Sequence, residues 1–276
     1  MKTTLILLVF QILFFYSLFS QKRIVPPGTV KLNDSTYIDK FEVTNLNYRE
    51  YMYWTAKKYG PKSPEFISIL PDTTVWGTKT RLAYVSLYLR HPAYANYPVV
   101  GVTYEQAVKY CEWRTDRVNE YIYFKENKIK PGTDISNVQI PKRIKFRLPT
   151  RKEWEEAAAY DFPRKIRKLL LKEKIALYEV FKFNFGDDYI KAPVESEITV
   201  PVHSYSPNVI GIYHILGNVA EMIDEYGIAK GGSWRQRPEE VTVLTDFRYY
   251  KPESWIGFRC VCDIIKEKNE DESEEK

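Results

Sequence analysis

The sequence predicts an α+β domain with few helices, short strands and many loops, and three observations carry this prediction. Three helical segments are marked by threonines at N-cap positions, Thr44, Thr103 and Thr150. Short alternating segments near the N-terminus are typical of strands. From Asn184 onward Gly, Pro and Asn recur, which leaves room only for short strands. With 276 residues, 44% of them hydrophobic and 15% aromatic, the chain can bury one sizeable core.

The first predicted elements are two strands followed by a helix. Residues 29–32 and 36–39 alternate like strands around a polar turn. Residues 41–59 are predicted to form a helix, because Thr44 supplies an N-cap ahead of a segment with apolar positions at helical spacing. Residues 60–97 are rich in proline and aromatic residues and show no helical period, so we expect a long irregular region.

Two further helices are predicted from their capping residues. Thr103 is followed three residues later by Gln106, the pattern of a capping box, and apolar residues then recur at helical spacing. A polar insert is expected at residues 120–143. The same capping pattern, with Glu153 as the partner, opens a third helix at residues 150–160.

The chain is expected to divide into a signal peptide at residues 1–20, one domain at 21–265 and a charged tail at 266–276. An apolar run over residues 5–19 follows a basic residue, and the small Ser20 stands where a signal peptidase would cut. The run is short for a membrane span, and an uncleaved anchor is the alternative. Acidic residues dominate the tail, which we expect to lack fixed structure.

A signal peptide predicts an exported protein, located in the periplasm, at the outer membrane or outside the cell. No later segment is long and apolar enough to span a membrane, so the mature chain is not expected to be an integral membrane protein. A basic helix is expected from Pro163 to about Phe181, with its cationic side chains in solvent. The formal net charge of +5 is too small and too dispersed to predict a nucleic-acid partner.

The chain contains three cysteines, Cys111, Cys260 and Cys262. In an exported protein, well-separated cysteines are candidates for a disulfide rather than for metal binding. Since the number is odd, at least one thiol must stay free or pair between molecules.

Five segments, taken in order, resemble one known family. They are IDKFEVTN at residues 38–45, YPVVGVT at 97–103, FRLPTRKEWE at 146–155, PNVIGIYHILGNVAE at 207–221, and GGSW at 231–234 with GFRC at 257–260. With these segments the chain resembles the formylglycine-generating enzyme, or sulfatase-modifying factor, family over about residues 26–263. The resemblance implies a variant of the C-type lectin fold, rich in loops around a small twisted sheet.

In active members of that family, two cysteines after the Gly-Gly-Ser motif bind copper and activate oxygen to oxidise a cysteine of the substrate. The matching positions here are Gln236 and Val241. Neither side chain supplies the soft thiolate ligand that Cu(I) prefers. The retained Ser233 has no activated partner beside it in the sequence. The resemblance therefore predicts a pseudoenzyme with no catalytic residues and no copper.

The resemblance also implies a disulfide between Cys111 and Cys260. Such a bond would close a loop of roughly 150 residues and stabilise the fold by about 2–4 kcal/mol. Two buried free thiols are the alternative. Cys262 is then the odd cysteine, and we expect it to point to the opposite face of its strand from Cys260.

Family members often hold Ca²⁺ at the Gly-Asn-Val loop. The matching positions here are His214, Gly217, Val219 and Glu221. Because Ca²⁺ takes six to eight hard oxygen ligands, the imidazole of His214 is a poor replacement for a side-chain oxygen. The alternative is that Glu221 pairs with a basic neighbour or caps the loop backbone.

The favoured function is a structural or binding module of the cell envelope with protein partners. Residues 69–76 and 113–120 resemble cysteine-free homologues among the gliding-motility and type IX secretion proteins of Bacteroidetes. One alternative is a formylglycine-generating-type oxidase or another residual enzyme acting on a protein substrate. A further alternative is a lectin-like module that binds glycan or peptide through the aromatic residues of 60–97, unless those residues serve as packing.

Overall fold

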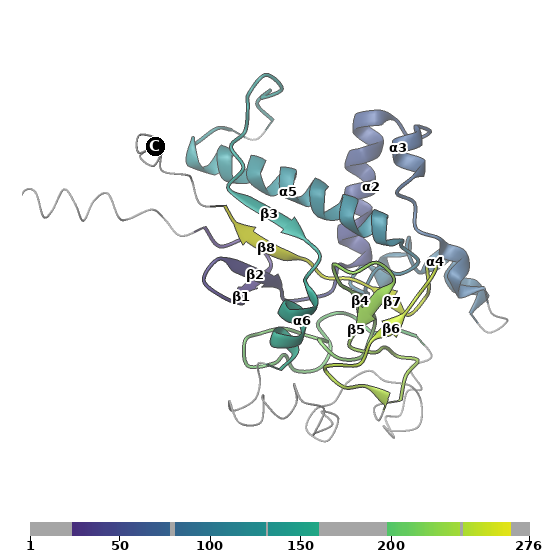
Figure 1. Ribbon diagram of the computed structural model, residues 1–276. Helices are drawn as coiled ribbons and strands as arrows, with labels where there is room; N and C mark the ends of the chain where they lie inside the picture. The colour runs from purple at the N-terminus through teal and green to yellow at the C-terminus, as the bar shows by residue number, and fades with distance from the viewer. Residues whose placement is uncertain (1–23, 78–80, 131, 160–197, 238–239, 266–276) are drawn as a thin grey trace, which may run out of the picture.

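The structure is a computed structural model that describes residues 24–77, 81–130, 132–159, 198–237 and 240–265 (Figure 1). The predicted signal peptide, the basic helix from Pro163 and the tail at 266–276 lie outside these ranges. The described residues form two small sheets, with helices beside them and long loops between them (Figure 1). The α+β, loop-rich architecture predicted from the sequence is confirmed.

The first sheet brings the two ends of the domain together. Its strands, in order and all antiparallel, are β1 (Thr29–Lys31), β2 (Thr36–Asp39), β8 (Val261–Ile264) and β3 (Ile144–Arg147). The two strands predicted at 29–32 and 36–39 are confirmed to within one residue. Strand β8 lies between β2 and β3, so that Cys262 is in register with Tyr37 on one side and with Phe146 on the other.

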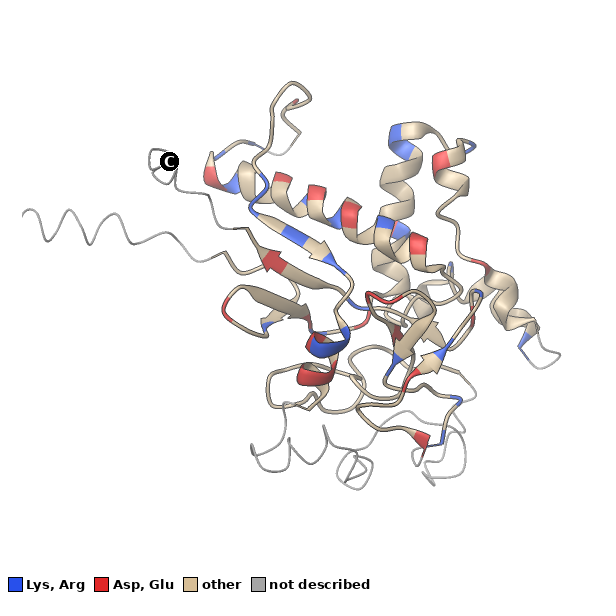
Figure 2. Cartoon of the chain, in the orientation of Figure 1, with Lys and Arg blue, Asp and Glu red and all other residues tan. Residues whose placement is uncertain are grey.

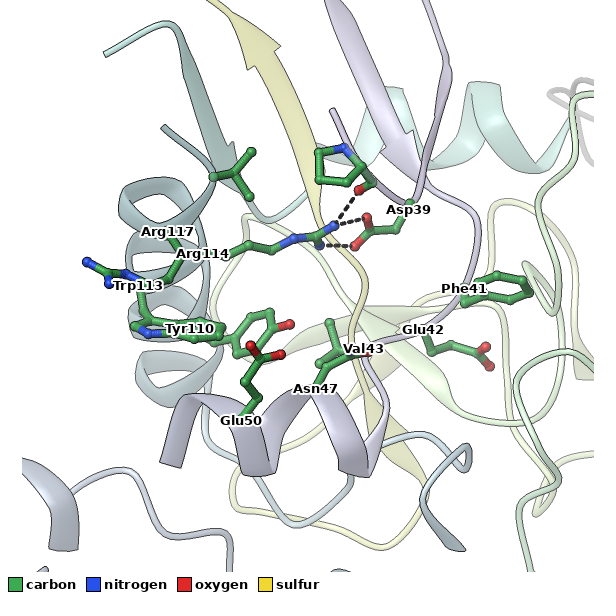
Figure 3. Close-up of a pocket in the computed structure, with 13 residues that line it drawn as sticks. Asp39, Phe41, Glu42, Val43, Asn47, Glu50, Tyr110, Trp113, Arg114 and Arg117 are labelled. Carbon is green, nitrogen blue, oxygen red and sulfur yellow. Dashed lines mark hydrogen bonds and ion pairs between the residues drawn. The ribbon is translucent and has the colours of Figure 1, made fainter. Parts of the chain in front are cut away.

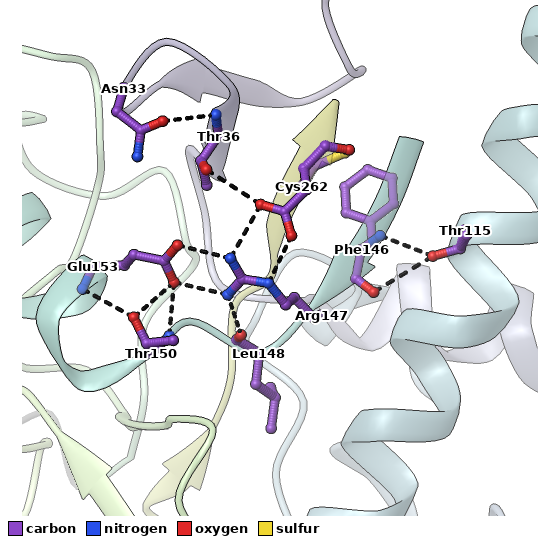
Figure 4. A network of polar contacts seen from close by, with 10 residues as sticks. Asn33, Thr36, Thr115, Phe146, Arg147, Leu148, Thr150, Glu153 and Cys262 are labelled. Atoms are coloured by element: carbon purple, nitrogen blue, oxygen red, sulfur yellow. Dashed lines mark hydrogen bonds and ion pairs between the residues drawn. The ribbon is translucent and has the colours of Figure 1, made fainter. Parts of the chain in front are cut away.

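Arg147 joins this sheet to the helix that follows β3, α6 (Arg151–Ala158), as Figure 4 shows. Its guanidinium donates to both carboxylate oxygens of Glu153 at 2.7 Å, and to those of Asp263 on β8 at 2.8 and 3.0 Å. Bidentate pairs of this kind fix orientation as well as contributing energy. Arg147 therefore fixes the position of the start of α6 against the first sheet.

The second sheet is built from very short strands. Its order is β6 (Phe247–Arg248), β5 (Ile228–Lys230), β4 (Ala220–Met222) and β7 (Ile256–Gly257). Strands β4 and β7 run parallel, and the other neighbours are antiparallel. This agrees with the turn-rich sequence after Asn184, which predicted short strands.

All three capped helices are confirmed. Helix α2 spans Asn45–Tyr59, α5 spans Tyr104–Glu126 and α6 follows Thr150. Each has a complete capping box, with Asn47, Gln106 and Glu153 respectively returning a side-chain bond to the N-cap backbone.

Helix α5 extends into the segment expected to be a polar insert. It packs against β3 and continues to Glu126, with Val118, Asn119 and Ile122 buried on its inner face. The Asn119 amide accepts from the backbone N–H of Ile144 at 3.1 Å and donates to the Ile144 carbonyl at 2.9 Å. The predicted boundary at residue 120 is thus wrong, because packing on a distant strand stabilises two further turns.

Residues 60–97 are not irregular throughout, as the sequence suggested. They contain four short helical segments: α3 (Pro64–Ile67), η1 (Thr73–Trp76), α4 (Leu82–Leu87) and η2 (Pro92–Tyr94). Segments of three to six residues are too short to show a helical period. The prediction was wrong for this physical reason.

Cys262 lies on the same side of its strand as Cys260, which corrects the expectation of opposite faces. Both thiols belong to the larger hydrophobic cluster, whereas Val261 between them belongs to a second cluster. In an extended segment, residues i and i+2 share a face, so the two cysteines point the same way.

Charged residues of both signs are interspersed along α5, as Figure 2 shows. Among the described residues, none of the helices combines the length and the apolar character needed to cross a bilayer.

Candidate functional site

Gln236 and Val241, the positions that the resemblance matches to the catalytic cysteines, follow strand β5 and a tight turn. Gly231 and Gly232 have φ angles of +90° and +66°, a region that glycine adopts without strain. A Cβ on Gly232 would lie 2.5 Å from Cγ2 of Val241. Glycine is therefore required at position 232 by its conformation and by the approach of Val241.

Gln236 and Val241 are both held by protein contacts. The Ser233 hydroxyl donates to Oε1 of Gln236 at 2.5 Å, and the backbone N–H of Gln236 donates to the Ser233 carbonyl at 3.1 Å. Val241 is 2% exposed and packs in the second hydrophobic cluster. An amide and a branched alkyl group thus stand at the two positions, and neither has the chemistry to bind Cu(I) or activate oxygen.

The three cysteines lie away from Gln236 and Val241, in the larger hydrophobic cluster. The sulfur atoms of Cys111 and Cys260 are 3.5 Å apart, both buried. Burial raises the pKa of Cys260 well above its usual value, and it raises the pKa of Cys262 to about 12. These two thiols are protonated at neutral pH and are poor nucleophiles. The predicted Cys111–Cys260 bond stays a prediction, supported by the proximity of the two sulfurs.

The loop proposed for Ca²⁺ leads into a buried ion pair. Glu221 accepts from Nε and Nη2 of Arg259 at 2.6 and 2.5 Å, and from the indole N–H of Trp154 at 2.8 Å. Neither side chain of the pair is exposed to solvent. The Glu221 carboxylate that a Ca²⁺ ion would need is therefore bound to the guanidinium of Arg259. This arrangement matches the alternative in which Glu221 pairs with a basic neighbour.

His214, the other side chain of the proposed Ca²⁺ set, is buried in a left-handed conformation with φ of +46°. Burial, and then the charge of Arg259, lower the pKa of His214 to about 4. Its ring is neutral at physiological pH, and its Nε2 has no hydrogen-bond partner within the described ranges. With a nitrogen at this position and Arg259 on Glu221, the residues present do not fit a Ca²⁺ ion.

The sequence reasoning missed Glu42, a second buried carboxyl beside this ion pair. Its Oε1 accepts from the Asn218 amide at 2.9 Å, and its Oε2 has no partner among the residues described. Burial raises the pKa of Glu42 to about 8, and the nearby Arg259 opposes this rise. Because Arg259 is bound to Glu221, we assign the excess proton to Glu42. Its only sequence signal was its place in the motif IDKFEVTN at residues 38–45.

Trp234, which follows the Gly-Gly-Ser turn, lies in an aromatic cluster. Its ring stacks on Trp76 at a centroid distance of 6.1 Å, and the guanidinium of Arg81 lies 4.7 Å from its centroid. Trp76 and Tyr88 are 1% and 2% exposed. Trp76 and Tyr88 of the segment 60–97 thus belong to a third core cluster, and Tyr84, Tyr94 and Tyr97 pack against it while only partly buried.

The described parts of the chain hold no group of three or more His, Cys, Asp and Glu side chains arranged to bind a metal ion. His91 instead accepts a hydrogen bond from the backbone of Ala93 at 3.2 Å, as the cap of a short helix.

Two cavities flank helix α5. The smaller cavity has a volume of about 440 Å³ and lies between the start of α2, the C-terminal end of β2 and α5 (Figure 3). At its edge Arg114 donates to both oxygens of Asp39, at 2.6 and 2.8 Å, while Glu50 projects from α2 towards Tyr110 (Figure 3). The larger, of about 870 Å³, lies between α2, α3 and α5. Trp113 lines both cavities.

Comparisons with known proteins agree with the sequence resemblance. The profile of the family described as "Sulfatase-modifying factor enzyme 1-like domain" matches residues 13–264. The serine/threonine-protein kinase Pkn1 of Chlamydia trachomatis is 23% identical over 256 residues, which are 83% of this chain and 33% of that protein. The formylglycine-generating enzyme of Mus musculus is 25% identical over 221 residues, which are 70% of this chain and 50% of that enzyme. The chain thus spans about a third to a half of the length of these relatives.

Solved structures resemble the chain more distantly. The crystal structure of CarF aligns with a TM-score of 0.48 and 17% identity, over 84% of this chain and 87% of that chain. Variable protein 1 of Treponema denticola aligns with a TM-score of 0.48 and 18% identity, over 87% of this chain and 92% of that chain.

Proposed function

Because the chain belongs to the sulfatase-modifying factor enzyme 1-like family, and has the fold of the formylglycine-generating enzyme, we propose that it is a non-catalytic binding module of the cell envelope. One observation carries this proposal. The two positions that supply the copper-binding cysteines in active members are filled by Gln236, bonded to Ser233, and by the buried Val241.

The remaining thiols support the loss of oxidase chemistry. Cys111, Cys260 and Cys262 are buried in a different hydrophobic cluster from Val241. A copper site requires accessible thiolates, and burial disfavours the thiolate form. We likewise propose no Ca²⁺ at the Gly-Asn-Val loop, where Arg259 neutralises Glu221.

The envelope location and the protein partner rest on sequence features alone. They are the apolar run at 5–19 and the likeness of 69–76 and 113–120 to gliding-motility and type IX secretion homologues. We do not extend the kinase activity in the name of the chlamydial relative to this chain, because the match covers 33% of that protein.

The alternative, a formylglycine-generating-type oxidase, is tested by incubating purified protein with a cysteine-containing sulfatase peptide, copper, oxygen and a thiol reductant. We expect mass spectrometry to show no conversion of the peptide cysteine to the aldehyde. The Gln236→Cys/Val241→Cys double variant, which has a thiol at each of the two positions, is assayed in parallel for comparison. Conversion by the unsubstituted chain would overturn the proposal.

The envelope role is tested by affinity purification of the tagged protein from cross-linked envelope extracts. We expect a defined set of envelope proteins to co-purify with it. Recovery of the chain alone, or only with cytoplasmic proteins, would contradict that role and leave the non-catalytic assignment standing.

A further inference from the structure

The larger cavity, between α2, α3 and α5, has the features of a ligand groove. At about 870 Å³ it falls in the size range of small-molecule and oligomer sites. It is lined by none of the residues at the family's catalytic positions. This groove is therefore separate from the positions of Gln236 and Val241.

Four aromatic side chains line this groove: Tyr51, Trp54, Tyr59 and Trp113. Tyr51, which is 5% exposed, packs against the partly buried Trp113 at a centroid distance of 5.2 Å, whereas Tyr59 at the rim is 48% exposed. Rings of this kind offer wide apolar faces with a polar edge, and they are common in recognition sites.

The ring faces at the rim are covered by flexible cations of the same chain. The ammonium of Lys57 lies 4.7 Å from the centroid of Trp54, and that of Lys58 lies 4.9 Å from the centroid of Tyr59. Exposed cation–π contacts contribute only about 0.5–1 kcal/mol, so these side chains can move aside when a ligand stacks on the rings.

The groove presents hydrogen-bond donors and acceptors to a ligand. The Trp113 indole N–H is buried without an acceptor among the described residues. Burial, and then the Glu112 carboxylate, raise the pKa of Tyr51 to about 12, so the phenol keeps its proton and is able to donate. Glu65 and Asp116, both exposed, bring carboxylate acceptors to the same groove.

The charges that line the groove nearly balance. Its cations are Lys57, Lys58, Lys109 and Arg117, and its carboxylates are Glu65, Glu112 and Asp116. The groove walls are helices, which offer no strand edge for an extended peptide. A neutral ligand with apolar faces and many hydroxyl groups satisfies both the rings and the donors and acceptors.

We infer that the groove between α2, α3 and α5 binds a neutral oligosaccharide, stacked on Trp54 and Tyr59 and hydrogen-bonded to Trp113, Tyr51 and the flanking carboxylates. This inference deepens the proposed binding role, on which it rests. It places the glycan surface on different aromatic residues from those of 60–97, of which Trp76 and Tyr88 are core.

The test measures binding of maltohexaose, cellohexaose and chitohexaose to the full chain by calorimetry and tryptophan fluorescence. An acidic hexasaccharide and an extended peptide serve as comparison ligands. We expect at least one neutral hexasaccharide to bind with a Kd of about 1 mM or tighter, and Trp54→Ala to weaken it about tenfold or more. Tyr121→Ala is the matched control, since Tyr121 is 58% exposed on α5 and lies outside the groove lining.

Each outcome decides the inference. Binding lost in Trp54→Ala and kept in Tyr121→Ala supports it, provided both variants melt cooperatively. The Glu112→Gln variant keeps the shape of the groove but removes a carboxylate. It should also weaken binding of the same hexasaccharide. No neutral hexasaccharide binding, binding insensitive to Trp54→Ala, or preferential binding of the acidic sugar or peptide overturns it. None of these results alters the copper and aldehyde assays, so the two proposals fail separately.

Discussion

The carboxylate of Glu221 and the guanidinium of Arg259 form a bidentate ion pair at which both side chains are 0% exposed. Arg259 also donates to the backbone carbonyls of Asp39 and Tyr213, at 3.0 and 2.8 Å. Arg259 therefore connects Glu221 on strand β4 to Asp39 at the end of strand β2. The pair stands where a Ca²⁺ loop was expected, and it links the two sheets.

Removing one partner of this pair is expected to be severe. Arg259→Met should lower the free energy of unfolding by about 3–5 kcal/mol, because it leaves a buried, uncompensated carboxylate. The double variant Glu221→Met/Arg259→Met should lose less than the single variant. Denaturant unfolding measures both, and Lys31→Ala, at an exposed pair with Asp34, should change stability by no more than about 0.5 kcal/mol. If Arg259→Met were as stable as the double variant, the loss of stability would not come from the unpaired Glu221 carboxylate.

Glu42 should make the fold less stable at high pH. Its folded-state pKa of about 8 lies above the ordinary glutamate value, so the folded chain holds a proton that the unfolded chain has lost. Its stabilising contribution is complete below about pH 4.3 and is lost as the pH rises towards about 8.

Glu42→Gln, which keeps an acceptor for Asn218, should remove that dependence and exceed the unsubstituted chain in stability by about 1–3 kcal/mol at pH 9. Unfolding curves at pH 5, 7 and 9 measure it. Glu156→Gln, at an exposed position on α6, should leave the profile unchanged. An identical pH profile for Glu42→Gln and the unsubstituted chain would contradict the assignment of the proton to Glu42.

Gly232→Ala should destabilise the fold by about 2–4 kcal/mol, since it combines an unfavourable φ with a clash against Val241. Gly132→Ala is the control: its φ is +87°, but nothing lies within 4 Å of the added Cβ, so only the conformational cost of about 1 kcal/mol remains. Adding Val241→Ala to Gly232→Ala should recover part of the loss, as measured by thermal melting. Equal losses at the two glycines would rule out the clash.

Cys111 and Cys260, with sulfurs 3.5 Å apart, should form a disulfide when the protein is oxidised. We expect one remaining thiol per chain after oxidation, measured in denaturant, and a gain of about 2–4 kcal/mol over the reduced form. Cys262→Ala should still oxidise, whereas Cys111→Ala should lose the shift in non-reducing electrophoresis. Three free thiols after oxidation would show that the bond does not form.

Local signals in the sequence predicted much of the fold. The three capping boxes at Thr44, Thr103 and Thr150 were readable because each is completed within four residues. The short helical segments within 60–97 were missed because they are too short for periodicity. The end of α5 was missed because Asn119 is held by a strand about 25 residues later in the chain.

The candidate site was predictable only in its composition. The sequence showed that Gln236 and Val241 replace cysteines, but not that Ser233 holds Gln236 or that Val241 closes over Gly232. The buried Glu42 depends on Asn218, 176 residues away. No local pattern reports such a contact.

Cu(I) titration against a chromophoric competitor, under anaerobic and reducing conditions, measures whether this family member holds a copper–thiolate centre. We expect the competitor to keep the metal, and we expect no stoichiometric site tighter than about 1 μM. One equivalent of Cu(I) retained by the unsubstituted, folded chain would contradict this expectation.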